Sequence, residues 1–170
     1  RSKLLELIDL SGRGLEIGPL TRPLVTREMG PVEYIDRAPR EELQRWYAGN
    51  AEVDVEKIVD VDHVWGDQSL LDCVGGQRAY RYLLAAHVIE HVPDLFGWLR
   101  EIAAVLVDGG IAAFVVPERG YTFDVRRRES SAAELVDAYV RRLRRPDARQ
   151  IFDHFYNFED LHAAAPEGPT

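Results

Sequence analysis

Two short and almost wholly apolar segments, Tyr80–Ala86 and Ile111–Val116, constrain the fold of this chain more than any other feature. Each has the length of a strand and lacks the alternation of a half-exposed strand, which is typical of strands buried on both faces. Between them, Pro93–Leu106 places its apolar residues on one face at helical spacing, and Val107–Gly110 has the composition of a turn. A buried strand, a helix and a second buried strand predict a parallel sheet of the α/β class.

The remaining hydrophobic patterns continue this alternation along the chain. They predict strands at 15–17, 32–35 and 55–61, and helices at 4–8, 21–28, 39–48, 132–143 and 147–155. No segment after Pro117 has the pattern of a strand. The sequence therefore predicts a doubly wound, mostly parallel sheet with helices on both faces.

Length and composition set further bounds. The chain has 170 residues, 46% of them hydrophobic, which suits one globular domain and argues against wholesale disorder. The longest clean apolar run, Ile111–Val116, is far below the roughly 20 residues that span a bilayer, so no membrane span is expected. Cys73 is the only cysteine, which rules out an internal disulfide and favours a reducing compartment. We therefore expect a cytoplasmic protein.

The charge of the chain is unevenly distributed. The formal net charge is −8, yet residues 126–149 hold eight arginines against four acids. The strongly acidic remainder disfavours nucleic acid as a partner, because phosphate binding needs a positive surface. The arginine-rich segment fits a solvated helix face better than a site for an anionic ligand or partner. We expect a core over residues 1–125 and a helical, arginine-rich extension of the same domain over 126–170, with a frayed tail at 163–170.

Acids, glycine and histidine follow the predicted strands. In open α/β sheets, ligands bind outside the carboxyl ends of the strands. Those positions carry Glu16, Gly18, Asp36, Arg37, Asp60, Val61 and His87. Burial of a carboxylate is costly unless a ligand donates hydrogen bonds to it, and Asp36 lies 20 residues after Glu16, about the spacing that places an acid on the two hydroxyls of a ribose. Each acid alone fits a solvated loop or a helix cap equally well, but together they favour a site.

In order and spacing, these motifs resemble those of the class I S-adenosylmethionine-dependent methyltransferases. The matching segments are LEIGP at 15–19, YID at 34–36, VDVD at 59–62, HVIEHVPD at 87–94, and LVDGG with IAAFVVPE at 106–118. The resemblance implies a Rossmann-like sheet, S-adenosyl-L-methionine as the cofactor, and methyl transfer to a small molecule or a saccharide hydroxyl. The segments LEIGPLTRPLV and YTFD are similar to those of members found near surface-polysaccharide glycosyltransferases.

The resemblance also implies roles for residues of this sequence. The implied cofactor contacts are Glu16, Gly18, Asp36, Arg37, Asp60, Val61, Ala86 and His87. Gly18 would let the backbone approach the methionine part of the cofactor, which Glu16 would orient through water or the loop. Asp36 would accept from both ribose hydroxyls. Asp60 and the Val61 amide would contact the adenine, and Ala86 with His87 would line the sulfonium side.

Two departures from the family pattern affect these expectations. The usual G-x-G-x-G motif is Gly18-Pro19-Leu20 here, so two glycines are absent and Pro19 has no amide to donate. The sixth and seventh strands of the family sheet are not apparent after Pro117. Either residues 119–170 replace them, a partner domain or second copy of the chain completes the sheet, or the chain is a fragment.

His91 and His87 are the candidate catalytic residues. A hydroxyl acceptor is a poor nucleophile at neutral pH, and a positioned imidazole would act as its general base. Both histidines follow the strand at 80–86, and His91 is the preferred base because it projects further toward the acceptor. The alternative is that both rings are structural and pack the turn.

Three other interpretations of the sequence remain open. His87, Glu90 and His91 match the H-x-x-E-H motif of zinc peptidases, but that motif needs a helix interior and Pro93 closes this segment, so no metal is expected. A nicotinamide-dependent oxidoreductase shares the second acid but needs three glycines after the first strand. A non-catalytic cofactor-binding or scaffolding domain of a larger glycan-modifying system is suggested by the absent last strands.

Overall fold

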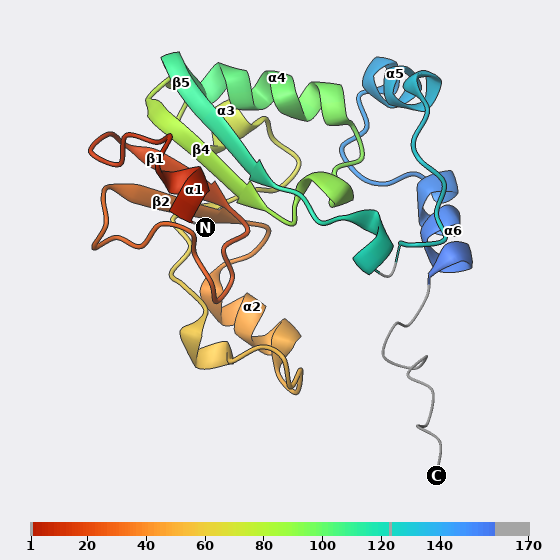
Figure 1. Ribbon diagram of the computed structural model, residues 1–170, viewed down its shortest axis with the longest axis horizontal. Helices are drawn as coiled ribbons and strands as arrows, with labels where there is room; N and C mark the ends of the chain where they lie inside the picture. The colour runs from red at the N-terminus through yellow and green to blue at the C-terminus, as the bar shows by residue number, and fades with distance from the viewer. Residues whose placement is uncertain (1, 123, 159–170) are drawn as a thin grey trace.

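Five parallel strands form the sheet on which the fold is built, and Figure 1 shows this sheet with the helices around it. A computed structural model describes residues 2–122 and 124–158 of the chain. The strands are β1 (Gly14–Ile17), β2 (Val32–Asp36), β3 (His63–Val64), β4 (Tyr80–Ala86) and β5 (Leu106–Val115). They lie in the order β3-β2-β1-β4-β5, and every neighbouring pair is parallel. The predicted doubly wound parallel sheet is confirmed, with its change of direction beside β1.

The two faces of the sheet are covered differently. The helices are α1 (Ser2–Leu5), α2 (Arg40–Tyr47), α3 (Leu70–Cys73), α4 (Leu95–Val105), α5 (Ala132–Arg141) and α6 (Ala148–Asn157), with 3-10 turns η1 (Val55–Lys57), η2 (Ile89–His91) and η3 (Arg119–Tyr121). Helices α3 and α4 pack on one face through Leu70, Trp98 and Ile102. The opposite face is covered by the chain around α1 and by the loop after β1, which contributes Val25.

Strand β4 is apolar throughout because both of its faces lie in the core. Leu83 and Ala85 join the cluster beneath α3 and α4, whereas Tyr82 and Leu84 join the cluster on the other face. The Tyr82 ring lies against β1 at Gly14, where an added Cβ would approach Tyr82 Cζ to 1.9 Å. Only glycine leaves room for that ring.

The strand predicted at 55–61 is wrong. Residues 55–57 form the turn η1, and the third strand is the two-residue β3 further along the chain. Side chains of α2 take the backbone carbonyls that a strand would need: Arg40 donates to the Glu56 oxygen at 3.0 Å and Gln44 to the Val55 oxygen at 3.1 Å. Val55 and Val61 pack beside Leu43 of α2 from this loop and not from a strand of the sheet.

The other differences from the predicted elements are smaller. The helix predicted at 21–28 does not form, and α1 ends at Leu5. Strand β5 begins at Leu106 and contains the predicted turn as an irregularity, with Gly109 at φ +76. Helix α3 was not predicted.

After β5 the described chain contains helices and no further strand. Helix α5 packs on α4 through an edge-to-face contact between Tyr139 and Phe96, with ring centroids 6.2 Å apart. The predicted frayed tail at 163–170 lies outside the described residues. Over the described ranges, no helix is long and apolar enough to cross a membrane.

Candidate functional site

The carboxyl ends of β1, β2 and β4 bring three of the predicted residues to one edge of the sheet. Ile17 pairs in register with Ile35 on one side and Ala85 on the other. The next residues along these strands are Gly18, Asp36 and Ala86, which therefore lie on neighbouring strands at the same end. This edge is where ligands of open parallel sheets bind.

Glu16 organises the loop that leaves this edge. Its side chain is 1% exposed, and its carboxylate accepts hydrogen bonds from the amides of Leu24 at 2.6 Å and Val25 at 3.1 Å. These bonds tie the loop after β1 to a side chain of the strand itself. Glu16 is thus placed to shape a ligand site through the loop.

Gly18 has the backbone conformation that a close ligand approach requires. Its φ is +65, in the left-handed region where side chains are disfavoured, and its amide donates to the Ile35 oxygen at 2.9 Å. An added Cβ would meet only Val88, at 3.4 Å. The missing side chain leaves space above the end of β1.

Asp36 is a carboxyl group in a partly desolvated position. Burial raises its pKa, against the lowering effect of a hydrogen bond from the Arg37 amide at 2.7 Å. The Arg37 guanidinium lies 4.7 Å from the centre of the Trp46 ring. A ligand that donates hydrogen bonds to Asp36 lowers this desolvation cost, as the two adjacent hydroxyls of a ribose would.

Asp60 and Val61 are not where the predicted strand would have placed them. They precede β3, and the Asp60 side chain is 79% exposed and forms an ion pair with Arg40 at 2.9 Å. The end of β3 instead presents residues 65–67, and the Trp65 amide donates to the main-chain carbonyl oxygen of Asp36 at 2.8 Å. No pattern in the sequence predicts that these three residues follow a strand, because a two-residue strand is too short to have a detectable pattern. Cofactor contacts by Asp60 and Val61 stay predictions.

The segment after β4 presents both candidate histidines, but not on one helix. His87 has φ +54 and a side chain 64% exposed, with Nδ1 3.6 Å from Glu90 Oε1. His91 ends the single 3-10 turn η2 and is exposed. Glu90 therefore lies beside His87, and its second oxygen, Oε2, is buried and has no hydrogen-bond partner among the described residues.

Two cavities adjoin this segment. The larger, of about 1420 Å³, is lined by Arg37, Trp46 and Trp65 on one side and by His91 and α5 residues on the other. The smaller, of about 410 Å³, lies between η2, α5 and α6. His91, Val92 and Pro93 line both, whereas Gly18 and Asp36 lie outside both linings. In the part of the chain that the structure describes, no group of three or more His, Cys, Asp or Glu side chains is placed to hold a metal ion.

Similarity to solved structures is low in sequence. A protein from Galdieria sulphuraria, provisionally described as a sarcosine dimethylglycine methyltransferase, is 19% identical, with a TM-score of 0.45 over 66% of this chain and 42% of that one. The CurJ carbon methyltransferase is 14% identical, with a TM-score of 0.45 over 92% of this chain and 44% of that one. A provisionally described S-adenosylmethionine-dependent methyltransferase from Methanococcus maripaludis is 12% identical, with a TM-score of 0.45 over 84% of this chain and 60% of that one.

The chain thus spans 42% to 60% of the length of these three proteins. A comparison with curated proteins finds no match. The family model described as "Methyltransferase domain" matches residues 1–165, nearly the whole sequence. The resemblance inferred from the motifs at the strand ends is therefore confirmed, and the chain belongs to the methyltransferase domain family, as a class I domain whose cofactor is S-adenosyl-L-methionine.

Proposed function

We propose that this chain is the catalytic domain of an enzyme that transfers a methyl group from S-adenosyl-L-methionine to a small molecule. The observation that carries the proposal is the Asp36 carboxyl, whose pKa is raised by burial at the end of β2. Such a carboxyl is stabilised by a ligand that donates two hydrogen bonds, and a ribose does so. Gly18, on the neighbouring strand, leaves the space for the rest of that ligand.

The other proposed cofactor contacts lie at the same carboxyl edge of the sheet. The cofactor supplies an activated methyl group on a sulfonium sulfur. Glu16 holds the loop beside it, while Gly18, Ala86 and His87 line the ends of β1 and β4. Asp36 and Arg37 bind the ribose side, and the large cavity beside Arg37 and Trp65 receives the adenine. Asp60 and Val61 would join them only by a movement of the loop before β3.

His91 is the proposed general base, with His87 as the second candidate. His91 is exposed and lines both cavities, so its imidazole can reach a ligand in either. A hydroxyl acceptor gains from an imidazole that removes its proton, by roughly 10²–10⁴-fold. We propose a saccharide or other small polyol as the acceptor, on the similarity of LEIGPLTRPLV and YTFD to polysaccharide-associated members.

The setting of the domain is also a proposal. Residues 1–125 form its cofactor-binding core and 126–170 its helical extension. In the described chain β5 pairs only with β4, so a partner domain or a second copy of the chain would complete the sheet there. The single cysteine and the lack of a long apolar segment favour the cytoplasm.

Calorimetric titration with S-adenosylhomocysteine, the product form of the cofactor, tests the proposal. We expect one ligand to bind per chain, while NAD gives no heat of binding. Binding of NAD in place of S-adenosylhomocysteine would overturn the cofactor assignment. Binding without methyl transfer to any of a panel of glycan precursors and small molecules would favour the non-catalytic alternative.

A further inference from the structure

The large cavity has room for more than the adenine that it is proposed to receive. Its volume of about 1420 Å³ exceeds the roughly 300–1,000 Å³ of a typical small-molecule site. Arg37 and Trp65 line the part in which the adenine is proposed to lie. Residues of α4 and of the end of α5 line another part, among them Arg100, Tyr139 and Arg142. A second ligand can therefore bind in the same cavity as the cofactor.

Positive charge is in excess among the charged residues that line this cavity. They are five arginines and three acids, namely Arg37, Arg100, Arg142, Arg144, Arg145, Asp67, Asp94 and Glu101. All three acids are engaged within the protein. Arg145 binds Asp67 at 2.9 Å, and Arg144 binds Glu101. Asp94 is buried and caps α4, where its carboxylate accepts from the Gly97 amide at 2.8 Å. The lining therefore has a positive potential, which favours an anionic ligand.

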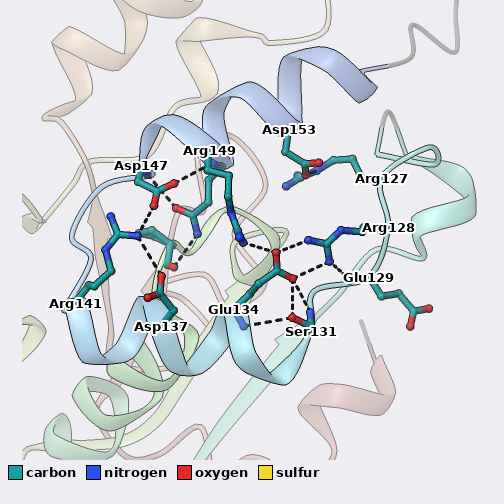
Figure 2. Close-up of polar contacts among 12 residues, drawn as sticks. Arg127, Arg128, Glu129, Ser131, Glu134, Asp137, Arg141, Asp147, Arg149 and Asp153 are labelled. Atoms are coloured by element: carbon teal, nitrogen blue, oxygen red, sulfur yellow. Dashed lines mark hydrogen bonds and ion pairs between the residues drawn. The ribbon is translucent and has the colours of Figure 1, made fainter.

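Other arginines of the extension have a different role, since they join α5 to α6 through ion pairs (Figure 2). Arg141 binds Asp137 at 3.1 Å and Asp147 at 2.6 Å. Arg127 binds Asp153 of α6 at 2.9 Å. An anion would have to compete with these carboxylates, so the arginines of this network are not suited to bind one.

Arg100, on α4, is held in position by an aromatic residue of α5. Its Nη1 donates a hydrogen bond to the Tyr139 hydroxyl, and its Cζ lies 5.7 Å from the centre of that ring. Tyr139 packs edge-to-face on Phe96 in turn. A guanidinium has five N–H donors in a planar fork, of which the Tyr139 hydroxyl takes one. Because Arg100 is exposed, further donors are accessible and can bind two oxygens of one anionic group.

Arg142 has a backbone conformation that is unusual for arginine. It ends α5 with φ +53 and ψ +52, in the left-handed region. Glycine or asparagine is usual in this conformation at the end of a helix, because a Cβ is disfavoured there. An arginine is therefore costly to the fold, and such a cost at a cavity wall points to a use of the side chain. Arg142 is exposed and lines the cavity, so its side chain is accessible to a ligand there.

We propose that Arg100 and Arg142 bind a phosphate group of the methyl acceptor in this part of the large cavity, the phosphate subsite, so that the acceptor is a phosphorylated saccharide or other small polyol. The proposal rests on the proposed function only in calling the ligand the methyl acceptor. A phosphate monoester carries a charge of about −1.5 to −2 at pH 7, close to the excess of two positive charges in the lining. His91 lines the same cavity, so the proposed base and the phosphate subsite belong to one site.

Three small molecules test the chemistry of the phosphate subsite. Glucose 6-phosphate carries a polyol and a phosphate, glucose lacks the phosphate, and inorganic phosphate lacks the polyol. Each is titrated into the full chain at constant ionic strength while backbone amide shifts are followed by NMR. We expect glucose 6-phosphate to shift the amides of residues 97–101 and 139–145. Inorganic phosphate should shift the same amides with an affinity weaker by roughly threefold or more, and glucose should not shift them.

Variants then test the two arginines. Arg142→Gly removes the guanidinium and suits the left-handed backbone, so it should weaken glucose 6-phosphate binding roughly tenfold or more while the melting temperature stays equal or rises. Arg100→Gln should weaken binding to a similar degree. Arg45→Gln is the matched control, because Arg45 is exposed on α2 and lies outside the linings of both cavities, and it should leave binding unchanged.

The phosphate subsite is overturned if glucose 6-phosphate leaves these amides unshifted, if glucose shifts them equally, or if Arg142→Gly binds glucose 6-phosphate as the unaltered chain does. Inorganic phosphate that binds as tightly as glucose 6-phosphate would overturn the assignment to the acceptor. S-adenosylhomocysteine affinity is measured on every variant and should not change, since a parallel loss would assign the arginines to the carboxylate of the cofactor. Failure of S-adenosylhomocysteine to bind the unaltered chain would refute the proposed function, whereas its binding without that of glucose 6-phosphate refutes only the phosphate subsite.

Discussion

Two aspartates that follow strand-like sequence, Asp36 and Asp60, have opposite surroundings in the structure. Burial raises the pKa of Asp36, which sits at the end of a true strand. Asp60 is 79% exposed and paired with Arg40. Because an exposed carboxylate has water as an alternative partner, a ligand gains little by binding it, and the structure favours Asp36 as the main contact.

Asp36→Ala is therefore expected to weaken S-adenosylhomocysteine binding by tenfold or more. Two hydrogen bonds to a charged group are lost, each worth roughly 1.5–3 kcal/mol. The melting temperature of the free chain should change little, since the replaced carboxyl is desolvated there. Calorimetry measures the affinity, with Asp60→Ala as the control that should show a clearly smaller loss. A dissociation constant for Asp36→Ala within twofold of the unaltered value would remove Asp36 from the site.

His91→Asn separates a base from a structural ring. We expect turnover to fall by roughly a hundredfold or more with cofactor affinity unchanged, because the imidazole is lost but the exposed position carries no packing. Single-turnover rates and calorimetry supply the two measurements, and His87→Asn is the comparison. Equal losses of affinity and melting temperature would show that His91 holds the turn, and unchanged turnover would show that no base at this position is needed.

At the scale of elements, one carboxylate fixes the long loop after β1. Glu16→Gln should lower the free energy of unfolding by roughly 1.5–3 kcal/mol, because the amide can accept from one of the Leu24 and Val25 amides but faces the other with a donor. Hydrogen exchange at these two amides should accelerate. Glu28→Gln, an exposed change in the same loop, should have no effect. Unchanged exchange in Glu16→Gln would mean that the loop is held by its other contacts.

A second carboxylate joins three strands at the opposite end of the sheet. Glu33 on β2 accepts from Arg13 at 2.6 Å, from Tyr80 of β4 at 2.6 Å, and bonds His63 of β3 at 2.7 Å. Burial opposes its charged form, but these hydrogen bonds outweigh the burial and lower the pKa of Glu33 to about 2. The charged carboxylate therefore stabilises the fold above its unfolded pKa of about 4.5, and that stability is lost as the pH falls from there toward 2.

Glu33→Gln should accordingly destabilise the chain by about 2–3 kcal/mol at pH 7. The difference from the unaltered chain should shrink as the pH is lowered from 5 toward 2, since protonation then removes from Glu33 the charge that the variant already lacks. Denaturant unfolding at several pH values measures it, and Glu52→Gln at an exposed site is the control. A difference that does not vary with pH would place the effect in packing and not in charge.

The elements that depend on local pattern were predictable from sequence, and those that depend on distant partners were not. The apolar sequence of β4 indicates directly that this strand is buried on both faces. The residues after β1, β2 and β4 could be placed at one edge of the sheet because each follows the end of a strand that the sequence predicts. The alternating segment at 55–61 failed because α2 side chains bind its carbonyls. Glu90 lies beside residues of α5 and α6 that follow it by more than 40 residues, so no local pattern in the sequence places it there.

At the scale of the whole molecule, the arginine-rich extension is joined to the core by exposed ion pairs. Arg145 binds Asp67, beside β3, at 2.9 Å, and Arg144 binds Glu101 of α4. Glu101 also accepts from the Leu70 amide at the start of α3, at 2.8 Å. The Arg145 side chain is 79% exposed and the Arg144 side chain is 48% exposed, so salt can screen both ion pairs. The extension thus depends in part on contacts that are weaker than those within the sheet.

Raising the salt concentration should therefore loosen the extension before it affects the sheet. The screening length falls from about 8 Å at physiological ionic strength to about 3 Å at 1 M, and each exposed pair contributes only about 0.2–1 kcal/mol. We expect amide exchange in α5 and α6 to rise by roughly two- to tenfold at 1 M sodium chloride, with exchange in β4 unchanged. An Arg144→Gln, Arg145→Gln double variant should exchange fast at low salt and lose the salt response. Exchange in α5 and α6 that ignores both the salt and the double variant would show that other contacts with the core, such as the Tyr139–Phe96 contact and the Gln150–Pro93 hydrogen bond, hold the extension in place.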